Sequence, residues 1–302
     1  MNKRSRFYWW RFKIDIPSFL EESIVWKLNS IGLNNFAIQF SPDYPDLYKL
    51  FIWLPSHEWS EEEREGLILC FLPLGKTFGI TLRSPEWEKC HDEDWNAVWK
   101  KYWKPDPVGE LILILPEWLR VTKSFSNRKV VKIDPGTAFG TGSHPTTRLC
   151  LEALERESLA GKSVADLGCG SGILSLTALA LGASKLFAID TDSLAVHSTM
   201  NNFLLNDFEQ DSLKVLHGSI DNLQSHLNSE KVDLLLCNIL LPVIKDLSPG
   251  FAQILKSDGI ALLSGILLDQ IPELTNFLNG LGWKVNNSWS KSNWGLIEIS
   301  RT

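Results

Sequence analysis

The residues that could do chemistry gather first in a glycine-rich stretch between an apolar run and a helical pattern. Within Val164–Ile173, three glycines alternate with other residues, as Gly168, Gly170 and Gly172, and Asp166 precedes them. Glycines at this spacing let the backbone turn sharply and let a ligand approach the main chain. A dinucleotide fingerprint needs glycine at position 173, where isoleucine stands, and a triphosphate loop needs a lysine after its last glycine. The pattern therefore favours a nucleoside that carries an amino acid and no phosphates.

A second carboxylate, Asp190, ends the next apolar run, Lys185–Asp190, about 20 residues after the glycines. An acidic residue at this place in such folds accepts hydrogen bonds from a ribose diol. The other interpretation of Asp190 is a helix N-cap, since a helical pattern opens at Leu194. We favour the ribose role because the glycine turn and the carboxylate occur together.

The stretch Asp134–Thr147 is crowded with glycine, proline and threonine, which excludes regular structure. It predicts a loop that leads into a helix, with Pro145 near the first helical positions. Such a loop can fold over a ligand, whereas a plain surface linker would not need Phe139 or this many glycines beside a strand. His144 is a candidate general base within it, although a lone loop histidine is more often structural.

Length, charge and cysteine content narrow the class of protein. A chain of 302 residues is long enough for two domains, and its net charge of −6 gives no general attraction to a nucleic-acid backbone. No apolar run approaches the roughly 20 residues of a membrane span, and the basic start, Met1–Lys13, is no signal peptide. Five cysteines without a C-x-x-C pair argue against a disulfide framework or a zinc site. We expect a cytoplasmic protein in a reducing compartment.

Tryptophan marks the first part of the chain, since residues 1–120 hold ten of the thirteen tryptophans. The pattern predicts a ferredoxin-like β-α-β-β-α-β unit, followed by a connecting helix over 93–103 and a strand over 111–115. Core packing explains most of these tryptophans, and a surface that grips a macromolecule is the other interpretation. We place the domain boundary near residue 120. The predicted strands are 7–16, 35–40, 48–54 and 78–82, and the predicted helices are 17–31 and 60–72.

The second part alternates strands with helices, which predicts a parallel, doubly wound α/β sheet. Asn238 follows its fourth strand and should face the same crevice as Gly168 and Asp190. We expect the last two strands, 283–289 and 294–300, to form an antiparallel hairpin. The other predicted strands are 185–190, 213–217, 232–237 and 259–266, and the helices are 173–181, 194–205, 244–255 and 271–281, with a polar helix and loop near 222–230.

Four stretches together resemble one known family. They are Asp134–Thr147, the glycine turn Asp166–Leu174, Ile189–Asp190 and Asn238–Leu240. The turn alone is similar to motif I of the class I S-adenosylmethionine methyltransferases. The full set resembles the PrmA family, which methylates large-subunit ribosomal protein eleven with S-adenosylmethionine as cofactor.

The resemblance implies a division of the chain by role. Residues 1–120 would recognise the substrate and form the connector, and residues 121–302 would form a Rossmann-like methyltransferase domain. The motif match is strong over 130–265, whereas the N-terminal part matches the family in layout more than in motif. No metal is implied. The expected cofactor-binding residues are Phe139, Thr147, Gly168, Gly170, Asp190 and Asn238.

Asn238 is also the expected catalytic residue. In amine and amide methyltransferases this place often holds Asn-Pro-Pro-Tyr, whose asparagine oxygen binds the acceptor nitrogen, whereas here the sequence continues Ile239-Leu240-Leu241. The missing aromatic ring argues against a flipped base or a planar amide, and an aliphatic amine fits better. A turn cap is the structural alternative for Asn238.

The implied acceptor is a lysine side chain or an N-terminal α-amine of the ribosomal protein. A lysine of pKa near 10.4 is neutral in about one part in 10³ to 10⁴ at pH 7, so its deprotonation costs on the order of 4–5 kcal/mol, and an α-amine costs less. A methyltransferase of another protein or a small molecule, and a non-catalytic binding module, are the alternatives. We expect a monomer that needs neither nucleic acid nor a membrane.

Overall fold

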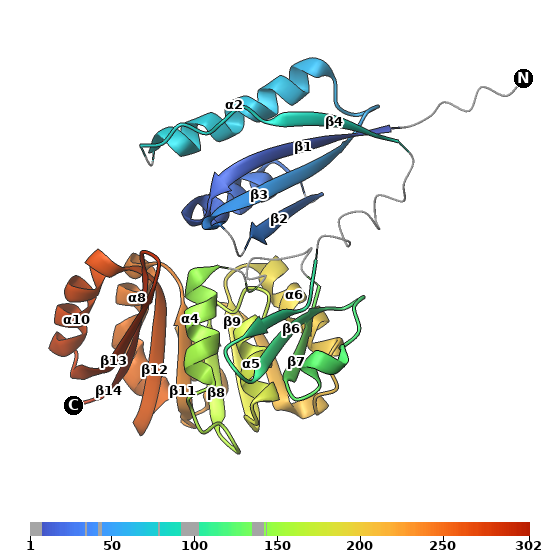
Figure 1. Cartoon of the computed structure of the whole chain (residues 1–302). Helices are drawn as coiled ribbons and strands as arrows, with labels where there is room; N and C mark the ends of the chain where they lie inside the picture. Colours follow the sequence, from blue (N-terminus) through green and yellow to red (C-terminus); the bar gives the residue numbers. More distant parts are fainter. Residues whose placement is uncertain are drawn as a thin grey trace, which may run out of the picture. The chain divides into compact units, whose positions relative to one another are not determined.

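Two compact units make up the chain, residues 1–104 and 105–302. The computed structural model describes residues 8–33, 35–41, 44–77, 79–91, 103–134, 142 and 144–302, and Figure 1 shows its elements coloured along the sequence. The division precedes a small sheet in the order β5-β6-β7, which belongs wholly to the second unit. The small sheet thus includes strands that the composition groups with residues 1–120, and the boundary near residue 120 stays a prediction. The three strands are β5 (Asp106–Val108), β6 (Ile112–Pro116) and β7 (Lys129–Ile133).

The first unit is a four-stranded antiparallel sheet with two helices. Its strands lie in the order β2-β3-β1-β4, and the chain passes through the elements in the order β-α-β-β-α-β that the sequence predicts. The ferredoxin-like assignment stays a prediction, which this strand order supports. The elements are β1 (Tyr8–Pro17), η1 (Ser18–Leu20), α1 (Glu21–Ser30), β2 (Phe36–Ser41), β3 (Tyr44–Pro55), α2 (Glu61–Thr77) and β4 (Glu86–His91).

Side chains of β3 alternate between the two faces of this sheet. Leu50, Ile52 and Leu54 pack in one buried cluster with residues of α1 and α2, whereas Phe51 and Trp53 belong to a separate cluster. Because successive side chains of a strand point to opposite faces, both helices cover the same face. Trp53 is 1% exposed, so core packing accounts for this tryptophan.

The fourth strand of the first unit lies later than predicted. It was expected over residues 78–82, but β4 spans Glu86–His91, where Trp87 stands opposite Phe12 of β1. Its position is set by pairing with β1, whereas α2 continues through Pro73 to Thr77 and residues 79–85 after it form no strand. The connecting helix predicted over 93–103 lies almost entirely outside the described residues.

The second unit is built on a seven-stranded sheet in the order β10-β9-β8-β11-β12-β14-β13. Its first five strands are parallel, and β14 is antiparallel to both neighbours. The predicted α/β doubly wound sheet and closing hairpin are confirmed. The strands are β8 (Ser163–Leu167), β9 (Lys185–Asp190), β10 (Leu213–His217), β11 (Val232–Asn238), β12 (Leu255–Leu267), β13 (Trp283–Lys291) and β14 (Trp294–Arg301). The helices are η3 (Lys123–Phe125), α4 (Pro145–Leu154), α5 (Ile173–Ala180), α6 (Ser193–Leu204), η4 (Gln210–Ser212), α7 (Ile220–Leu227), α8 (Leu241–Leu247), η5 (Ser248–Gly250), α9 (Phe251–Ile254), η6 (Leu268–Gln270) and α10 (Ile271–Gly280).

Two hydrophobic layers sandwich the central sheet. In β11, Leu234 and Leu236 pack with residues of α4 and α5, whereas Leu235 and Cys237 pack with residues of α7 to α10. Figure 1 shows α4 running across the near side of the sheet. The strand order reverses between β8 and β11, and in sheets of this kind ligands bind outside the carboxyl ends of the strands at that point.

The small sheet is bound to α4 by charged side chains. The carboxylate of Glu155, directly after α4, accepts hydrogen bonds from the backbone N–H groups of residues 110–112, each at 2.9 Å. Arg148 of α4 forms an ion pair with Asp106 of β5. The small sheet is thus fixed to the helix that begins at the predicted ligand site.

One predicted helix of the second unit is shorter than expected. The sequence predicts a helix over 244–255, but α8 ends at Leu247 and β12 already begins at Leu255. Pro249 and Gly250 interrupt the helical pattern, so only the short η5 and α9 lie between α8 and β12. The polar segment near 222–230 contains the end of α7, as expected.

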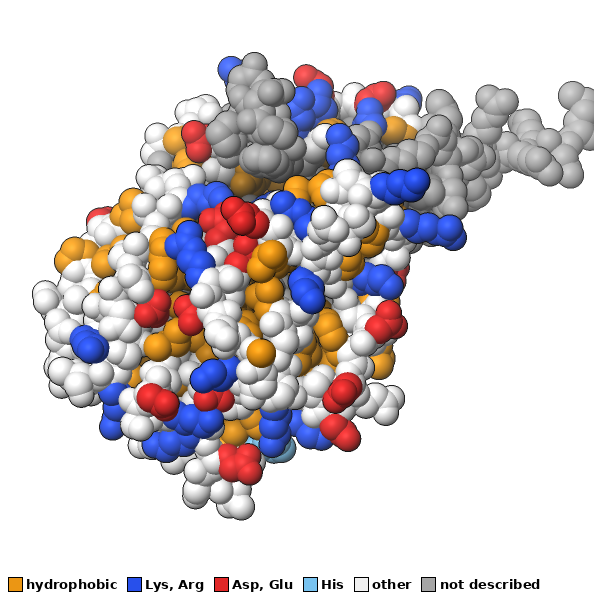
Figure 2. Space-filling view, turned by 60° about the horizontal axis from the view of Figure 1, so that its bottom comes forward, with side chains coloured by type: hydrophobic (Ala, Val, Ile, Leu, Met, Phe, Trp, Pro, Cys, Tyr) orange, Lys and Arg blue, Asp and Glu red, His pale blue; other side chains and the backbone are white. Residues whose placement is uncertain are grey.

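The surface of the molecule shows charges of both signs. In the view of Figure 2, Lys and Arg side chains lie interspersed with Asp and Glu side chains. Within the described residues, none of the helices has the length and apolarity needed to span a membrane. All five cysteines are free thiols, and three of them, Cys150, Cys169 and Cys237, are buried.

Candidate functional site

The glycine turn joins β8 to α5 at the carboxyl edge of the sheet. Gly168 has φ of +76° and Gly172, the N-cap of α5, has φ of +79°, a conformation that favours glycine. A Cβ at position 168 would lie 2.5 Å from Cγ2 of Ile239, and one at position 172 would lie 2.8 Å from Cγ2 of Thr199. Backbone shape and lack of space therefore both require glycine at these two positions.

Asp190 binds the turn directly. Its Oδ2 accepts a hydrogen bond from Gly170 N at 3.0 Å, and its Oδ1 accepts one from Asp192 N at 2.9 Å. The N-cap of α6 is Asp192, whose Oδ1 accepts a hydrogen bond from Leu194 N at 2.8 Å. Capping is therefore not the role of Asp190. A carboxylate offers about four lone-pair positions, so the half-buried Asp190 keeps acceptor capacity for a diol.

Asp166 lies buried beside the turn and is 1% exposed. Its Oδ2 accepts a hydrogen bond from Ser175 Oγ at 2.6 Å, and its Oδ1 has no hydrogen-bond partner among the described residues. Burial raises the pKa of Asp166 to about 6 although the Ser175 hydroxyl lowers it, and the charge of Asp190 adds to the rise. A buried carboxylate oxygen without a partner is costly, so a cation or a donor beside it is favoured.

Asn238 and Thr147 meet from two different elements. Asn238 ends β11, Thr147 lies in the first turn of α4, and Asn238 Nδ2 donates to Thr147 Oγ1 at 3.5 Å. The N-cap of α8 is Leu240, without a side-chain bond, so Asn238 does not cap that helix. Because Thr147 takes the Nδ2 end of the amide, the Oδ1 end is the one available to accept a hydrogen bond from a ligand.

His144 caps α4. Its Nδ1 accepts a hydrogen bond from Thr146 N at 3.3 Å and lies 2.8 Å from Thr146 Oγ1, and its ring meets that of Trp294 edge-on at 5.0 Å between centroids. Burial lowers the pKa of His144 to about 4, so the ring is neutral at pH 7 and a weak base. The structural interpretation of His144 fits this arrangement. Among the described residues, no three His, Cys, Asp or Glu side chains are grouped so that they could hold a metal ion.

One family accounts for nearly the whole sequence. The family profile described as "Ribosomal protein L11 methyltransferase (PrmA)" matches residues 8–302. The chain belongs to the PrmA family. The match includes the first unit, which resembles the family in layout more than in motif. It also confirms the resemblance carried by the four stretches named in the sequence.

Other PrmA family members are similar over their full length. The ribosomal protein L11 methyltransferase of Prochlorococcus marinus is 50% identical over 301 residues, covering 100% of this chain and 99% of the relative. That of Parasynechococcus marenigrum is 53% identical over 285 residues, covering 94% and 99%. Among solved structures, the ribosomal protein L11 methylase of Lactobacillus delbrueckii subsp. bulgaricus is 29% identical, with a TM-score of 0.59, covering 66% of this chain and 100% of that one.

The predicted PrmA site residues fall into two groups in the structure. Gly168, Gly170 and Asp190 form the first, and Thr147 with Asn238 forms the second. The groups adjoin, because a Cβ on Gly168 would contact Ile239, the residue that follows Asn238. Phe139 lies outside the described residues, together with the rest of 135–141. The cofactor role of all six stays a prediction.

Two buried polar residues of α6 were not predicted. Thr199 Oγ1 donates to Gly170 O at 3.0 Å, and Asn202 Nδ2 donates to Ser171 O at 2.9 Å. The sequence pattern of this segment predicts a helix and no site residue. The available signal is that Ser198, Thr199 and Asn202 lie close together on a helix that packs on the sheet, where polar residues are unusual unless they form hydrogen bonds.

Proposed function

We propose that the chain transfers methyl groups from S-adenosylmethionine to amino groups of ribosomal protein L11, on lysine side chains, on the N-terminal α-amine, or on both. The observation that carries the proposal is the hydrogen bond from Gly170 N to Asp190, which joins the glycine turn to the predicted ribose carboxylate in a chain of this family. The names of the relatives at 50% and 53% identity state this substrate for those proteins.

The residues at the carboxyl edge of the sheet fit S-adenosylmethionine. We assign the ribose to Asp190 and the main-chain contacts to the turn at Gly168 and Gly170, where the backbone is open to close approach. Asp166, whose Oδ1 has no hydrogen-bond partner in the described part of the chain, favours the positive charge of this cofactor. The pyrophosphate of a dinucleotide would instead be repelled by the two carboxylates. The assigned contacts are completed by Phe139, Thr147 and Asn238.

The task of the protein is to place a neutral amine. When bound, S-adenosylmethionine supplies a methyl group that its sulfonium already activates. Asn238, held at Nδ2 by Thr147, can accept a hydrogen bond from the amine N–H at Oδ1 and so orient the nitrogen lone pair. Holding the amine and the methyl donor together in the reactive geometry can lower the barrier by roughly 7–11 kcal/mol in total, and Asn238 would supply a part of this. His144 is too weak a base to remove the proton at neutral pH, so we assign deprotonation of the amine to solvent.

The two units have separate roles in the proposed reaction, which we place in the cytoplasm. We assign substrate recognition to the first unit and methyl transfer to the second, because the glycine turn, Asp190 and Asn238 all belong to residues 105–302. We propose the cytoplasm as the compartment, which suits five free cysteines, and a monomer without need of nucleic acid as the active form.

Titration calorimetry of the full chain tests the cofactor assignment. We expect one-site binding of S-adenosylmethionine and no measurable heat of binding with NAD at the same concentration. Binding of NAD without binding of S-adenosylmethionine would overturn the proposal, because it would give the glycine turn a different ligand.

A further inference from the structure

One face of α6 carries buried polar side chains that the proposed cofactor contacts do not include. Thr199 and Asn202 lie three residues apart, which places them on the same side of α6, and Asn206 follows two residues after the end of the helix. Thr199 and Asn202 are both 0% exposed. Polar groups buried this deeply are tolerated when they are hydrogen-bonded, so the partners of this face show what it does.

The side-chain amide of Asn202 bridges two segments that are far apart in the sequence. Its Nδ2 donates to Ser171 O at 2.9 Å, and its Oδ1 accepts a hydrogen bond from Asp134 N at 2.7 Å. Ser171 lies within the glycine turn, and Asp134 follows the end of β7. Both ends of the amide are therefore in use, and the bridge needs a donor and an acceptor on one short side chain.

The neighbours of Asn202, which are Thr199 on α6 and Asn206 just after the helix, each bind only one of these two segments, and Asn206 Nδ2 also donates to Asn202 O at 2.7 Å. Thr199 Oγ1 donates to Gly170 O in the turn at 3.0 Å. Asn206 Oδ1 accepts a hydrogen bond from Lys132 N at 2.8 Å, and its Nδ2 donates to Lys132 O at 2.9 Å. Asn206 thus bonds to the edge of β7 as a neighbouring strand would. Among the described side chains, only that of Asn202 bonds both to the turn and to Asp134, the residue that follows β7.

We propose that Asn202 is a positioning residue for cofactor binding. It fixes the main chain of the glycine turn relative to the end of β7, so the turn has its binding geometry before the cofactor arrives. A turn that is already ordered loses less conformational freedom on binding, which raises affinity. The inference rests on the proposed function, because S-adenosylmethionine is the ligand that we assign to this turn.

The matched variants Asn202→Asp and Asn206→Asp separate positioning from stability. Each replaces an amide by a carboxylate of the same size, which still accepts a backbone N–H but no longer donates to a backbone carbonyl. The acceptor lost at position 202, Ser171 O, is part of the turn, whereas the acceptors lost at position 206, Lys132 O and Asn202 O, are not. We expect Asn202→Asp to raise the Kd of S-adenosylmethionine about tenfold or more and Asn206→Asp to change it by less than about twofold.

Calorimetric titration of the wild type and both variants with S-adenosylmethionine, together with their Tm values, gives the answer. An unchanged Kd in Asn202→Asp would contradict the inference alone. Equal losses of affinity in both variants would also contradict it, because the effect would then follow general destabilisation. A wild type that does not bind S-adenosylmethionine would contradict the proposed function and, with it, this inference.

A measurement on the wild-type chain keeps the inference testable should Asn202→Asp not fold. Asp134 N–H is bonded to Asn202, and Lys132 N–H is bonded to Asn206. We expect S-adenosylmethionine to slow the hydrogen exchange of Asp134 N–H, measured by NMR, more than that of Lys132 N–H, because only the first is joined to the turn. Unchanged exchange at Asp134 on addition of the cofactor would contradict the inference.

Discussion

At the scale of single residues, the two carboxylates beside the glycine turn differ in what they can bind. Asp190 is half-buried at the end of β9 and accepts hydrogen bonds from two main-chain N–H groups. Asp166 is buried, accepts a hydrogen bond from Ser175 Oγ at one of its two oxygens, and has its pKa raised to about 6 by burial. Asp190 is therefore the residue that can offer further lone pairs to a neutral diol, and Asp166 is the one that gains from a nearby positive charge.

Asp190→Ala is expected to weaken binding of S-adenosylmethionine by roughly 1.5–3 kcal/mol, since hydrogen bonds to a charged group are lost. The matched control is Asp192→Ala, which removes the N-cap of α6 and should cost about 0.5–2 kcal/mol of stability while leaving the affinity nearly unchanged. Calorimetric titration and urea unfolding measure the two effects separately. Equal affinities of the wild type and Asp190→Ala would remove Asp190 from the cofactor site.

Asn238→Ala is expected to cost rate more than stability. It removes an amide at the open end of β11, where little packing is lost, so unfolding should change by about 1 kcal/mol or less. Turnover should fall by one to several factors of about ten, each worth about 1.4 kcal/mol of barrier. The loss follows from the role of Oδ1 in orienting the amine.

A pH–rate profile on two peptides checks the role of Asn238. The wild-type rate should rise with pH on a peptide that offers only lysine, because more of the amine becomes neutral. It should level off earlier on a peptide with a free α-amine, whose pKa is about 8. If Asn238→Ala kept the wild-type turnover on both peptides, Asn238 would have a structural role only.

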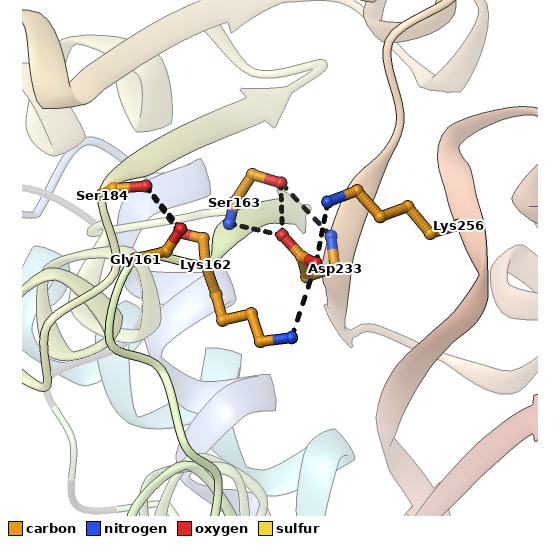
Figure 3. A network of polar contacts seen from close by, with 6 residues as sticks. All are labelled: Gly161, Lys162, Ser163, Ser184, Asp233 and Lys256. Carbon is orange, nitrogen blue, oxygen red and sulfur yellow. Dashed lines mark hydrogen bonds and ion pairs between the residues drawn. The ribbon is translucent and has the colours of Figure 1, made fainter.

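At the scale of elements, a polar network joins three strands near their starting ends, away from the glycine turn. Figure 3 shows Asp233 of β11 between Ser163 of β8 and the side chains of Lys162 and Lys256. Asp233 Oδ2 accepts hydrogen bonds from Ser163 N at 2.9 Å and Ser163 Oγ at 2.8 Å, and Oδ1 accepts one from Lys256 Nζ at 2.8 Å. The network therefore ties β8, β11 and β12 together without touching the site.

Asp233→Asn is expected to lower the free energy of unfolding at neutral pH by on the order of 1–2 kcal/mol. Burial opposes ionisation of Asp233, but hydrogen bonds from Lys256 and Ser163 outweigh it and hold the pKa below its usual range. The unfolded chain, with a pKa of about 3.9, takes up the proton first as pH falls, so the stabilisation is present above that pH and lost below it.

Urea unfolding over a range of pH measures this contribution. The difference between wild type and Asp233→Asn should be full at neutral pH and shrink once the pH falls below about 4. The affinity for S-adenosylmethionine should stay unchanged at neutral pH, which serves as the control for an intact site. A stability difference that persists unchanged into acid would show that the charge of Asp233 does not stabilise the fold.

Local patterns predict the elements of the second unit, and distant contacts explain what the sequence leaves open. The glycine spacing and the apolar runs are local, so the turn, β9 and the end of β11 are found where expected. The strand β4 was misplaced because its position depends on pairing with β1, not on its own pattern. Asn202 was missed because its partners, Ser171 and Asp134, lie 31 and 68 residues away. Asp190 and Asp192 are both suited to cap α6, and only the hydrogen bonds distinguish them.

At the scale of the whole molecule, the division at residue 104 predicts separable roles. A chain of residues 105–302 keeps the small sheet, its bonds to Glu155 and all described site residues, so it should bind S-adenosylmethionine with nearly the affinity of the full chain. It should methylate ribosomal protein L11 poorly, because the unit that we assign to substrate recognition is missing. Calorimetry and a methyl-transfer assay on both chains measure this. Full activity of the shorter chain would contradict the assignment of the units.

The most direct test of the central proposal is methyl transfer itself. Purified full-length chain is incubated with S-adenosylmethionine and ribosomal protein L11, and the intact mass of L11 is measured, with Asn238→Ala as the control. We predict that the mass rises in steps of one CH₂ group, that fragmentation places the added groups on lysine or N-terminal nitrogens, and that Asn238→Ala slows the rise. An unchanged mass of L11 in a mixture where the wild-type chain binds S-adenosylmethionine would contradict the account.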